Sequence, residues 1–384
     1  MPTRTILKAY RYKLRPTPAQ EIQLRQFGGA TRWVYNTLLS QRIEVYEKQG
    51  KSLSYSQQAK QLTEWKRTDE LSWLKIIDSQ VLQQAAMDLD QAFKNFFKRR
   101  QQGVGFPRFK KKRDINDSFR YPQRVKIKHN RVYLPKIGWL RFFKSRDLPS
   151  EPRSVTVKQQ ASGWYVSILC EVEIPDVQPP TPTLDNSVGV DVGIKSLLVT
   201  SDGDEFPALS AYRRAEKKLA KAQKALSRKT RGSHRYMKQR RRVARLHERI
   251  RHIRKDYAHK VTTWLVRNYD AIFVEDLNIA GMLRNRHLSK SLADAAMGQI
   301  LRMLAWKCKE HGVVLQKISR WFPSSKTCHA CGQMTATLTL NDGHLRRLLK
   351  PVIHTKDLFF RRICIAYCHI YTQYTGYRRK GDGG

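Results

Sequence analysis

The sequence has 384 residues, of which 74 are Lys or Arg and 32 are Asp or Glu, so its formal net charge is +42. So large a positive charge opposes compaction unless a polyanion neutralises it, and the candidates are nucleic acid and an anionic membrane. We find no apolar run long enough to span a bilayer and no signal peptide. Because the cations are mixed with Tyr, Phe and Trp, composition favours nucleic acid, excludes a membrane partner and predicts a cytoplasmic protein.

The N-terminal part predicts a strand followed by helices. Residues 5–14 alternate in part and end before Pro16, as a strand does. From about 18 to 100 the apolar residues recur at helical spacing. On the last of these helices, Gln80, Gln83 and Gln84 are candidates for base-edge contacts, since Gln can pair with adenine N6/N7. Exposed glutamines without a ligand explain them equally well.

Residues 103–113 form a Gly/Pro loop with aromatics between cations. We expect phosphate contacts from this loop, and a solvated basic loop is the alternative. Its candidate residues are Arg108, Lys110, Lys111 and Lys112. Short strand patterns return between 118 and 175. The proline-rich stretch from Pro175 to Pro182 is the clearest linker, and we place the main domain boundary there.

Two further apolar runs end on acids. Val188, Val190 and Val192 favour a strand, and Asp191 lies among them. Residues 271–274 run into Glu275 in the same way. Two strands that each end on an acid are what a divalent-metal phosphodiester site needs, because hard Mg²⁺ takes oxygen ligands. A turn Asp and a helix-capping Glu are the alternative at either position alone.

Residues 210–262 predict a helical hairpin with a break near Gly232. One face carries an apolar seam, and the other faces are almost wholly Lys and Arg. Because acids that could form i,i+4 pairs are scarce, we expect Arg240, Arg241 and Arg242 to lie along a nucleic-acid backbone rather than on a solvated face. A further helix from about 292 to 310 is expected to pack behind the Glu275 strand.

The cysteines do not predict a disulfide framework. Cys170 and Cys308 lie in apolar contexts and are expected to be buried free thiols. Cys328 and Cys331 have the Cys-x-x-Cys spacing of half a zinc site.

The segments Gly-Val-Asp191-Val-Gly-Ile-Lys, Val-Glu275-Asp-Leu and Phe322-Pro-Ser-Ser-Lys-Thr-Cys-His-Ala-Cys-Gly occur in an order that resembles the TnpB-type (OrfB) proteins of small bacterial transposons, relatives of the type V CRISPR effectors. Val34-Tyr35-Asn36 and Gly105-Phe-Pro-Arg-Phe-Lys110 are similar to N-terminal segments of that family. The resemblance covers about residues 5–340.

The resemblance implies a multidomain α/β and α+β protein with a RuvC-like (RNase H-type) nuclease domain. It also implies a guide RNA from the transposon end, a double-stranded DNA target, and Mg²⁺ or Mn²⁺ held by Asp191 and Glu275. We expect a monomer in the bacterial cytoplasm. The domains are a wedge β-barrel (1–15 and 101–178), a helical recognition insertion (16–100), the nuclease domain (186–321), half a zinc ribbon (322–342) and an aberrant, disordered tail (343–384).

The C-terminal part departs from the family. A second Cys-x-x-Cys and the Asp-Arg-Asp segment that supplies a third metal-binding acid do not follow the first Cys pair. Codons compatible with the residues from His344 onward, read one base out of phase, can encode Thr-Cys-Glu-Asp-Cys. We therefore hypothesise a frameshift near residue 342. The expected functions are an impaired RNA-guided endonuclease, a nuclease-dead RNA-guided repressor, or a frameshifted product without function, and the zinc site is incomplete.

Overall fold

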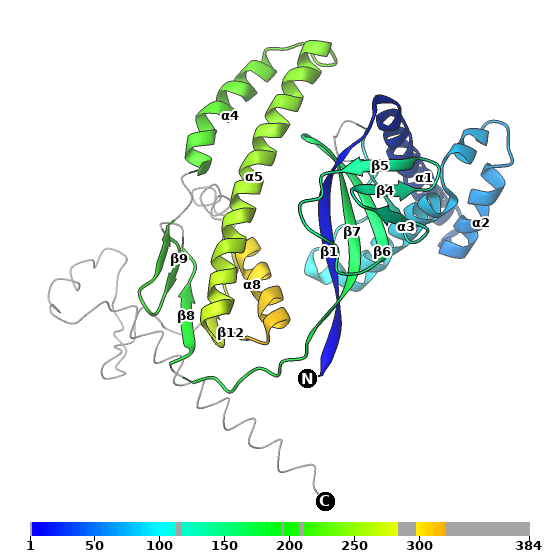
Figure 1. Cartoon of the computed structure of the whole chain (residues 1–384). Coiled ribbons are helices and arrows are strands. Elements are labelled where there is room, and N and C mark those ends of the chain that lie inside the picture. Colours follow the sequence, from blue (N-terminus) through cyan, green and yellow to red (C-terminus); the bar gives the residue numbers. More distant parts are fainter. Residues whose placement is uncertain are drawn as a thin grey trace, which may run out of the picture. The chain divides into compact units, whose positions relative to one another are not determined.

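The computed structural model divides the chain into two compact units at Pro175, the predicted linker (Figure 1). The first unit spans Thr3–Ile174, and the second contains Pro175 and the residues after it. The structure describes residues 2–112, 117–183, 185–193, 196–207, 211–282 and 297–318.

The first unit is built on a seven-stranded sheet with the order β2-β6-β7-β1-β5-β4-β3. The strand predicted over 5–14 is confirmed as β1. The bounds are β1 Thr3–Arg15, β2 Ser118–Tyr121, β3 Lys126–Lys128, β4 Arg131–Leu134, β5 Gly138–Phe142, β6 Pro152–Gln160 and β7 Gly163–Pro175. Inward-facing residues alternate with outward-facing ones along β7, as in a half-buried strand.

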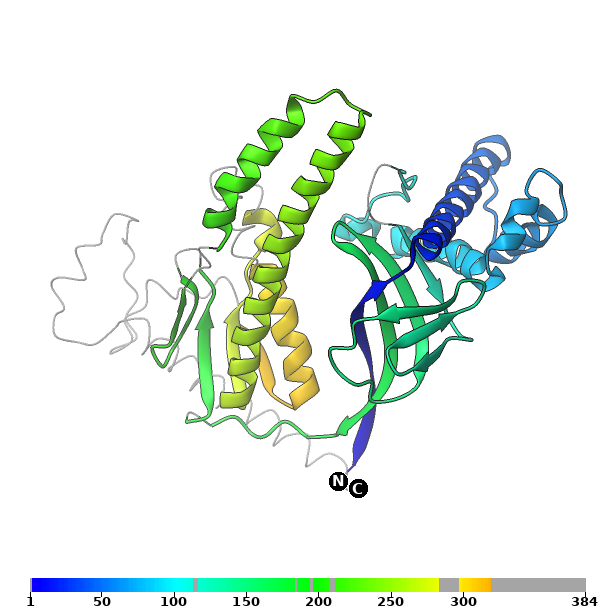
Figure 2. The same cartoon turned by 45° about the horizontal axis from the view of Figure 1, so that its top comes forward.

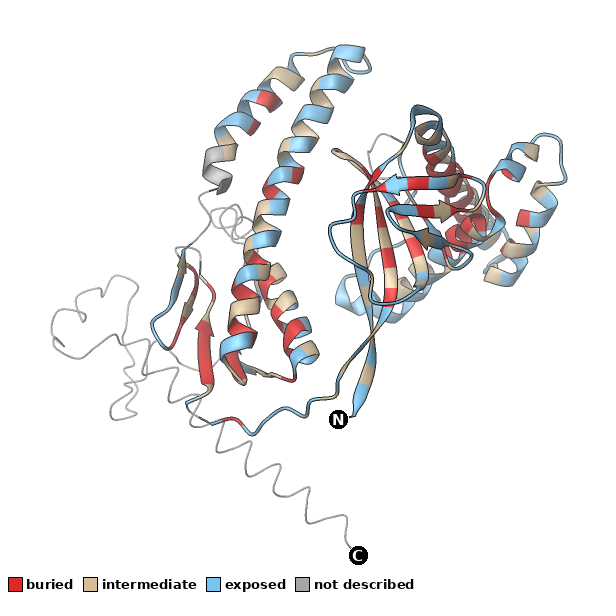
Figure 3. Cartoon of the chain, in the orientation of Figure 1, coloured by how far each residue is buried: buried red, intermediate tan, exposed pale blue. Residues whose placement is uncertain are grey.

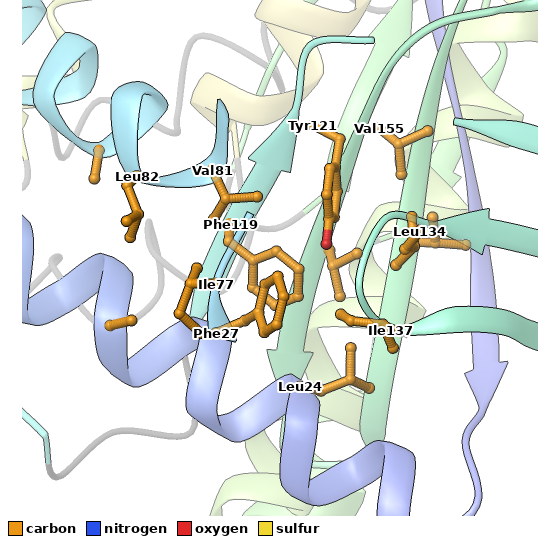
Figure 4. Packing of buried hydrophobic residues seen from close by; sticks show 14 of the residues in the cluster. Leu24, Phe27, Ile77, Val81, Leu82, Phe119, Tyr121, Leu134, Ile137 and Val155 are labelled. Carbon is orange, nitrogen blue, oxygen red and sulfur yellow. The ribbon is translucent and has the colours of Figure 1, made fainter. Parts of the chain in front are cut away.

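The predicted closed barrel is wrong for the described strands. The edge strands β2 and β3 lie at opposite ends of the sheet order, and no pairing among the described residues joins them. They have only four and three residues, so they offer few hydrogen bonds for closure. Helices cover this part of the sheet instead: the ring of Phe27 lies 5.4 Å from that of Phe119 and 6.4 Å from that of Tyr121 (Figure 4).

The helices predicted between 18 and 100 are confirmed, and they lie in the chain between β1 and β2. Their bounds are α1 Pro18–Gln49, α2 Tyr55–Trp65, the 3₁₀ turn η1 Ser72–Ile76, α3 Ser79–Arg99 and the 3₁₀ turn η2 Arg100–Gln102. Thr17 and Gln20 form a capping box at the start of α1, and Gly50 ends the helix in the left-handed conformation. Leu24 and Phe27 of α1 share one core with Val81 and Leu82 of α3 and with the sheet (Figure 4).

The second unit contains a five-stranded sheet with the order β10-β9-β8-β11-β12. β8 pairs with β9 in the antiparallel direction and with β11 in the parallel direction, and β11 pairs with β12 in parallel. The bounds are β8 Ser187–Asp191, β9 Ser196–Thr200, β10 Glu205–Pro207, β11 Ala271–Glu275 and β12 Val314–Ile318.

The predicted helical hairpin is confirmed as α4 (Ala211–Ser227) and α5 (His234–Asn268), which run side by side (Figures 1 and 2). Gly232 has a φ of +87° at the turn, a conformation that glycine adopts without strain. The C-terminal half of α5 and α8 (Met297–His311) pack on the sheet and form its core with Val188, Val190, Ile272 and Val274, which are buried (Figure 3). The described residues of this unit also include the short helix α6 (Ile279–Met282).

Cys170 and Cys308 are buried free thiols, as predicted. Burial raises the pKa of the Cys308 thiol to about 12, so this side chain is neutral and unreactive near neutral pH. No helix within the described ranges is both long and apolar enough to cross a membrane.

Two adjacent glycines of α1 give a test of the packing between α1 and the segment before β2. A Cβ atom at Gly28 would lie 2.5 Å from the Cβ of Asp117, whereas a Cβ at Gly29 would meet nothing closer than 3.8 Å. We predict that Gly28→Ala lowers the free energy of unfolding by about 1–3 kcal/mol, because the backbones must move apart. Gly29→Ala should raise it by about 0.5–1 kcal/mol through helix propensity. Denaturant unfolding of both variants checks this, and equal effects would contradict the close approach.

Candidate functional site

The two strand-end acids lie on neighbouring parallel strands. β8 and β11 pair in register from Ser187 with Ala271 to Val190 with Val274, and Asp191 and Glu275 are the next residues of each strand. Registered residues of parallel strands project to the same face, and neighbouring strands lie about 4.8 Å apart. The register therefore brings two carboxylates together on one face at the carboxyl ends of the strands. Both residues are half-buried.

Two glycines near Asp191 lie close to the strand β9 and the turn that follows it. Gly189 donates its amide hydrogen to the Ser201 hydroxyl at 3.1 Å. A Cβ at Gly193 would lie 2.9 Å from the Ser196 carbonyl oxygen. Glycine is thus required at position 193, two residues after Asp191, because the chain returns closely into β9 there.

Asp276, next to Glu275, has a different role. Its carboxylate lies 3.3 Å from the Lys317 ammonium, and its backbone amide donates to the Ile318 carbonyl at 2.9 Å. This acid is therefore engaged with β12.

Two acids are not a full metal site. The described part of the chain contains no group of three His, Cys, Asp or Glu side chains that could hold a metal ion. The half ribbon at 322–342 with Cys328 and Cys331, and the tail at 343–384, lie outside the described residues. The same holds for Asp342 and Asp357, the two nearest acids that follow the Cys pair. The incomplete zinc site and the absence of a third metal-binding acid stay predictions.

The predicted cationic residues of the hairpin lie on α5. Arg241 and Arg242 are exposed, and Arg240 is half-buried. The apolar seam is real: Leu219 and Ala222 of α4 and Ile250 of α5 are buried. Between His234 and Arg254 of α5 the sequence has one acid, Glu248. Its side chain is buried and lies 3.7 Å from His252. The hairpin thus presents a cationic surface with no exposed acid on this stretch.

The basic loop between α3 and β2 is attached to α1. The Asn36 side chain accepts from the Lys110 amide at 2.8 Å and donates to the Lys110 carbonyl at 2.9 Å. The Lys110 ammonium lies 3.9 Å from the Tyr35 ring centroid, and burial lowers the pKa of this lysine. Arg108, Lys111 and Lys112 are exposed.

The three glutamines of α3 differ in their surroundings. Gln83 is exposed, whereas the Gln84 side chain is 9% exposed and its oxygen accepts from the Arg120 Nε at 2.7 Å. The Gln80 oxygen accepts from Arg124 Nε at 3.3 Å. Base contact by these glutamines stays a prediction, and in this structure only Gln83 is both exposed and outside these arginine contacts.

Sequence reasoning missed the arginines that hold these glutamines. Arg124 also pairs with Asp78, the N-cap of α3, at 2.8 Å. The alternation of β2 contained the signal for Arg120, because Phe119 and Tyr121 are buried and the residue between them must face outward.

Three family models match the chain. Residues 167–286 match the OrfB/IS605 model, described as a probable transposase, residues 1–51 match a helix-turn-helix model of the same group, and residues 298–369 match the Cas12f1-like TNB domain. Within residues 1–51 this chain has one strand and one long helix, β1 and α1. The third match extends past residue 342, where the sequence departs from the expected pattern.

Full-length relatives agree with these models. The chain is 37% identical to the "Putative RNA-guided DNA endonuclease InsQ" of Escherichia coli K12, over 94% of this chain and 92% of that protein. It is 38% identical to a protein of the same description from Streptomyces pristinaespiralis, over 88% and 83%. Among solved structures, a Cas12f1 chain from a complex with guide RNA and target DNA has a similar fold, with a TM-score of 0.52 and 12% identity over 94% of this chain and 99% of that one. The chain belongs to the OrfB (TnpB-type) family of transposon-encoded proteins.

Proposed function

We propose that this chain is a transposon-associated RNA-guided DNA endonuclease, which takes a guide RNA from the transposon end and acts on double-stranded DNA. The observation that carries the proposal is the placement of Asp191 and Glu275 on adjacent parallel strand ends, in a chain of net charge +42. The named relatives of the family are described as RNA-guided DNA endonucleases. The central β8, antiparallel to β9 and parallel to β11, supports an RNase H-type (RuvC-like) nuclease domain.

The donor set fits a hard divalent cation. Asp191 and Glu275 offer carboxylate oxygens on one face, and Mg²⁺ or Mn²⁺ prefers oxygen ligands. A bound Mg²⁺ would supply Lewis-acid stabilisation of the charge that develops on the phosphodiester oxygens. The two side chains hold that position because their strands are fixed by the buried valines and Ile272 behind them.

The cations hold the nucleic acid by its phosphates. Arg241 and Arg242 on the hairpin and Arg108, Lys111 and Lys112 on the basic loop are exposed, and phosphate contacts fix register without reading sequence. Sequence is then read by base pairing between guide and target, so the protein recognises charge and shape.

The second candidate is a nuclease-dead RNA-guided DNA-binding protein that represses by occupancy. It is favoured by the missing Asp-Arg-Asp context, since a site without its third acid loses a metal ligand and cuts poorly. A frameshift near residue 342 is the hypothesis for that loss, and the match of the Cas12f1-like model through residue 369 weighs against it. Sequencing the gene and translating all three phases decides it, because no Asp-Arg-Asp in either other phase would exclude the frameshift.

The catalytic role of Asp191 and Glu275 can be tested by substitution, with the adjacent acid Asp276 as a control. We predict that Asp191→Asn or Glu275→Gln lowers Mg²⁺-dependent cleavage of a guided DNA target at least about 100-fold. RNA binding should be nearly unchanged, because these acids hold metal rather than phosphate. Asp276→Asn, which removes the charge that pairs with Lys317, is the control and should keep most of the activity. Cleavage that persists in both variants would show that the site is elsewhere, and target binding without cleavage by the unmodified chain would favour the repressor.

The hairpin can be tested by salt dependence. Replacing Arg240, Arg241 and Arg242 together by Gln should weaken RNA binding to a similar degree for all sequences. It should also flatten the salt dependence by roughly one unit of slope for each phosphate that the variant no longer neutralises. The control is Lys260→Gln on the same helix, whose ammonium already lies 2.9 Å from Asp256. An unchanged slope would mean that the hairpin presents a solvated face.

The zinc expectation concerns the Cys328 and Cys331 pair. A structural zinc needs four ligands, and two thiolates leave the ion open to water. We predict sub-stoichiometric zinc in the purified protein, measured by elemental analysis. The tail carries two further cysteines, Cys364 and Cys368, whose spacing is not that of a zinc ribbon. One tightly held zinc per chain that is lost on replacing either of them by Ser would contradict this prediction and would make the tail a true ribbon.

A further inference from the structure

The C-terminal end of α3 and the basic loop together carry an aromatic cluster that the proposed function does not use. The rings of Phe93, Phe96, Phe97 and Phe106 contact one another, with centroid separations from 5.3 to 6.3 Å. Phe106 packs edge-on against both Phe93 and Phe96, at 5.4 Å from each. This packing attaches the loop to α3, because Phe106 belongs to the loop and the other three rings belong to the helix.

Two rings of this region face solvent, one from this cluster and one from the loop after Phe106. Phe97 is 70% exposed and Phe109 is 49% exposed. Single exposed apolar residues are common, but several exposed rings within one short stretch of chain indicate an interaction site. We call Phe97, Phe106 and Phe109 the phenylalanine surface.

The loop that carries Phe109 is held at two points. Gly103, at a φ of +82°, turns the chain after η2, and Phe106 then packs on α3. Four residues later, Asn36 of α1 holds the Lys110 backbone through hydrogen bonds in both directions. Arg108 and Phe109 lie between these two anchors and are exposed, so their side chains are presented by a fixed backbone. Such preorganisation lowers the entropy lost when a ligand binds.

The phenylalanine surface is surrounded by positive charge, which favours an anionic ligand. From Gln91 to Lys112 the chain has eight Lys or Arg and no Asp or Glu. The two acids just before this segment are engaged by cations: Asp90 lies 2.9 Å from Lys94 and 3.2 Å from Arg42, and Asp88 lies 3.9 Å from Arg120. An aromatic patch surrounded by cations fits an anionic polymer whose bases can stack on rings, which is the chemistry of single-stranded nucleic acid.

We infer that Phe97 and Phe109 are stacking positions for unpaired bases of the guide RNA, with Arg108 and its neighbouring cations on the adjacent phosphates. The inference rests on the proposed function and adds a defined RNA contact to it. The guide is preferred over the displaced DNA strand because it is bound before any target is met. An exposed aromatic patch is an aggregation liability in a resting protein unless the resident ligand covers it.

The test separates binding that depends on the bases from binding that depends on the phosphates. The full-length protein is titrated with a labelled oligoadenylate RNA of about ten nucleotides, with an abasic RNA of the same length and with oligodeoxyadenylate. The double variant Phe97→Leu, Phe109→Leu keeps apolar side chains and removes both rings. Phe106 is left in place because it packs on α3. The matched control is Phe143→Leu, since Phe143 is 55% exposed and lies after β5.

We expect the double variant to bind oligoadenylate RNA roughly tenfold more weakly, with abasic RNA binding and the salt slope unchanged. The control should match the unmodified protein. An unchanged affinity for oligoadenylate, or an equal loss on abasic RNA, would overturn the inference. A loss confined to DNA would assign the surface to the displaced strand, and a change of oligomeric state in the RNA-free variant would assign it to a second copy of the chain, so either result would also overturn it.

Failure of this inference and failure of the proposed function give different results. If the unmodified protein retains an RNA transcribed from the transposon end while the double variant binds oligoadenylate normally, only the stacking positions are wrong. If the unmodified protein retains no such RNA, the proposed function fails and the stacking positions fail with it.

Discussion

The parallel pairing of β8 with β11 is the constraint on which the candidate site depends. Val190 pairs with Val274, and this register carries Asp191 and Glu275 to the same face at neighbouring strand ends. A slip of one residue would turn one acid to the opposite face. The register is fixed by burial: Val188 and Val190 of β8, with Ile272 and Val274 of β11, lie in one core with α5 and α8. Each such side chain contributes about 1.5–3 kcal/mol when fully buried, so the core that stabilises the unit also places the acids.

The same helix, α5, joins this core to a cationic surface. Ala258, Val261 and Leu265 of its C-terminal half pack on the sheet, whereas the N-terminal half pairs with α4 and carries the Arg240–Arg242 cluster. Near the junction with α8, the Lys307 ammonium donates to the His259 carbonyl at 2.7 Å and to the Thr262 hydroxyl at 2.9 Å. Hydrogen bonds of this kind are what a charged group needs in order to be buried. One continuous helix therefore carries the cationic cluster at one end and, at the other end, packs on the sheet that positions the two acids.

Local patterns in the sequence were sufficient for much of this structure. The short strand patterns between 118 and 175 predict the region of β2 to β7, and the helical seam predicts α4 and α5. Features that depend on distant residues were beyond such patterns. The barrel prediction failed because closure depends on how β2 and β3 meet in space, and α1 and α3 pack on β2 instead. The Asn36–Lys110 contact joins residues 74 apart, and Gln84 is held by an arginine 36 residues away. Long-range pairing of this kind leaves no periodicity for a sequence to show.

The central claim is that Asp191 and Glu275 share one divalent cation, and its most direct measurement is an anomalous difference map. Crystals of the RNA-bound protein would be soaked in Mn²⁺, which takes the same oxygen ligands as Mg²⁺ and scatters anomalously. The account predicts a peak at ligand distance from both carboxylates, which disappears in the Asp191→Asn protein. A Mn²⁺ peak bound by other acids, with none between these two strand ends at saturating metal, would contradict the account.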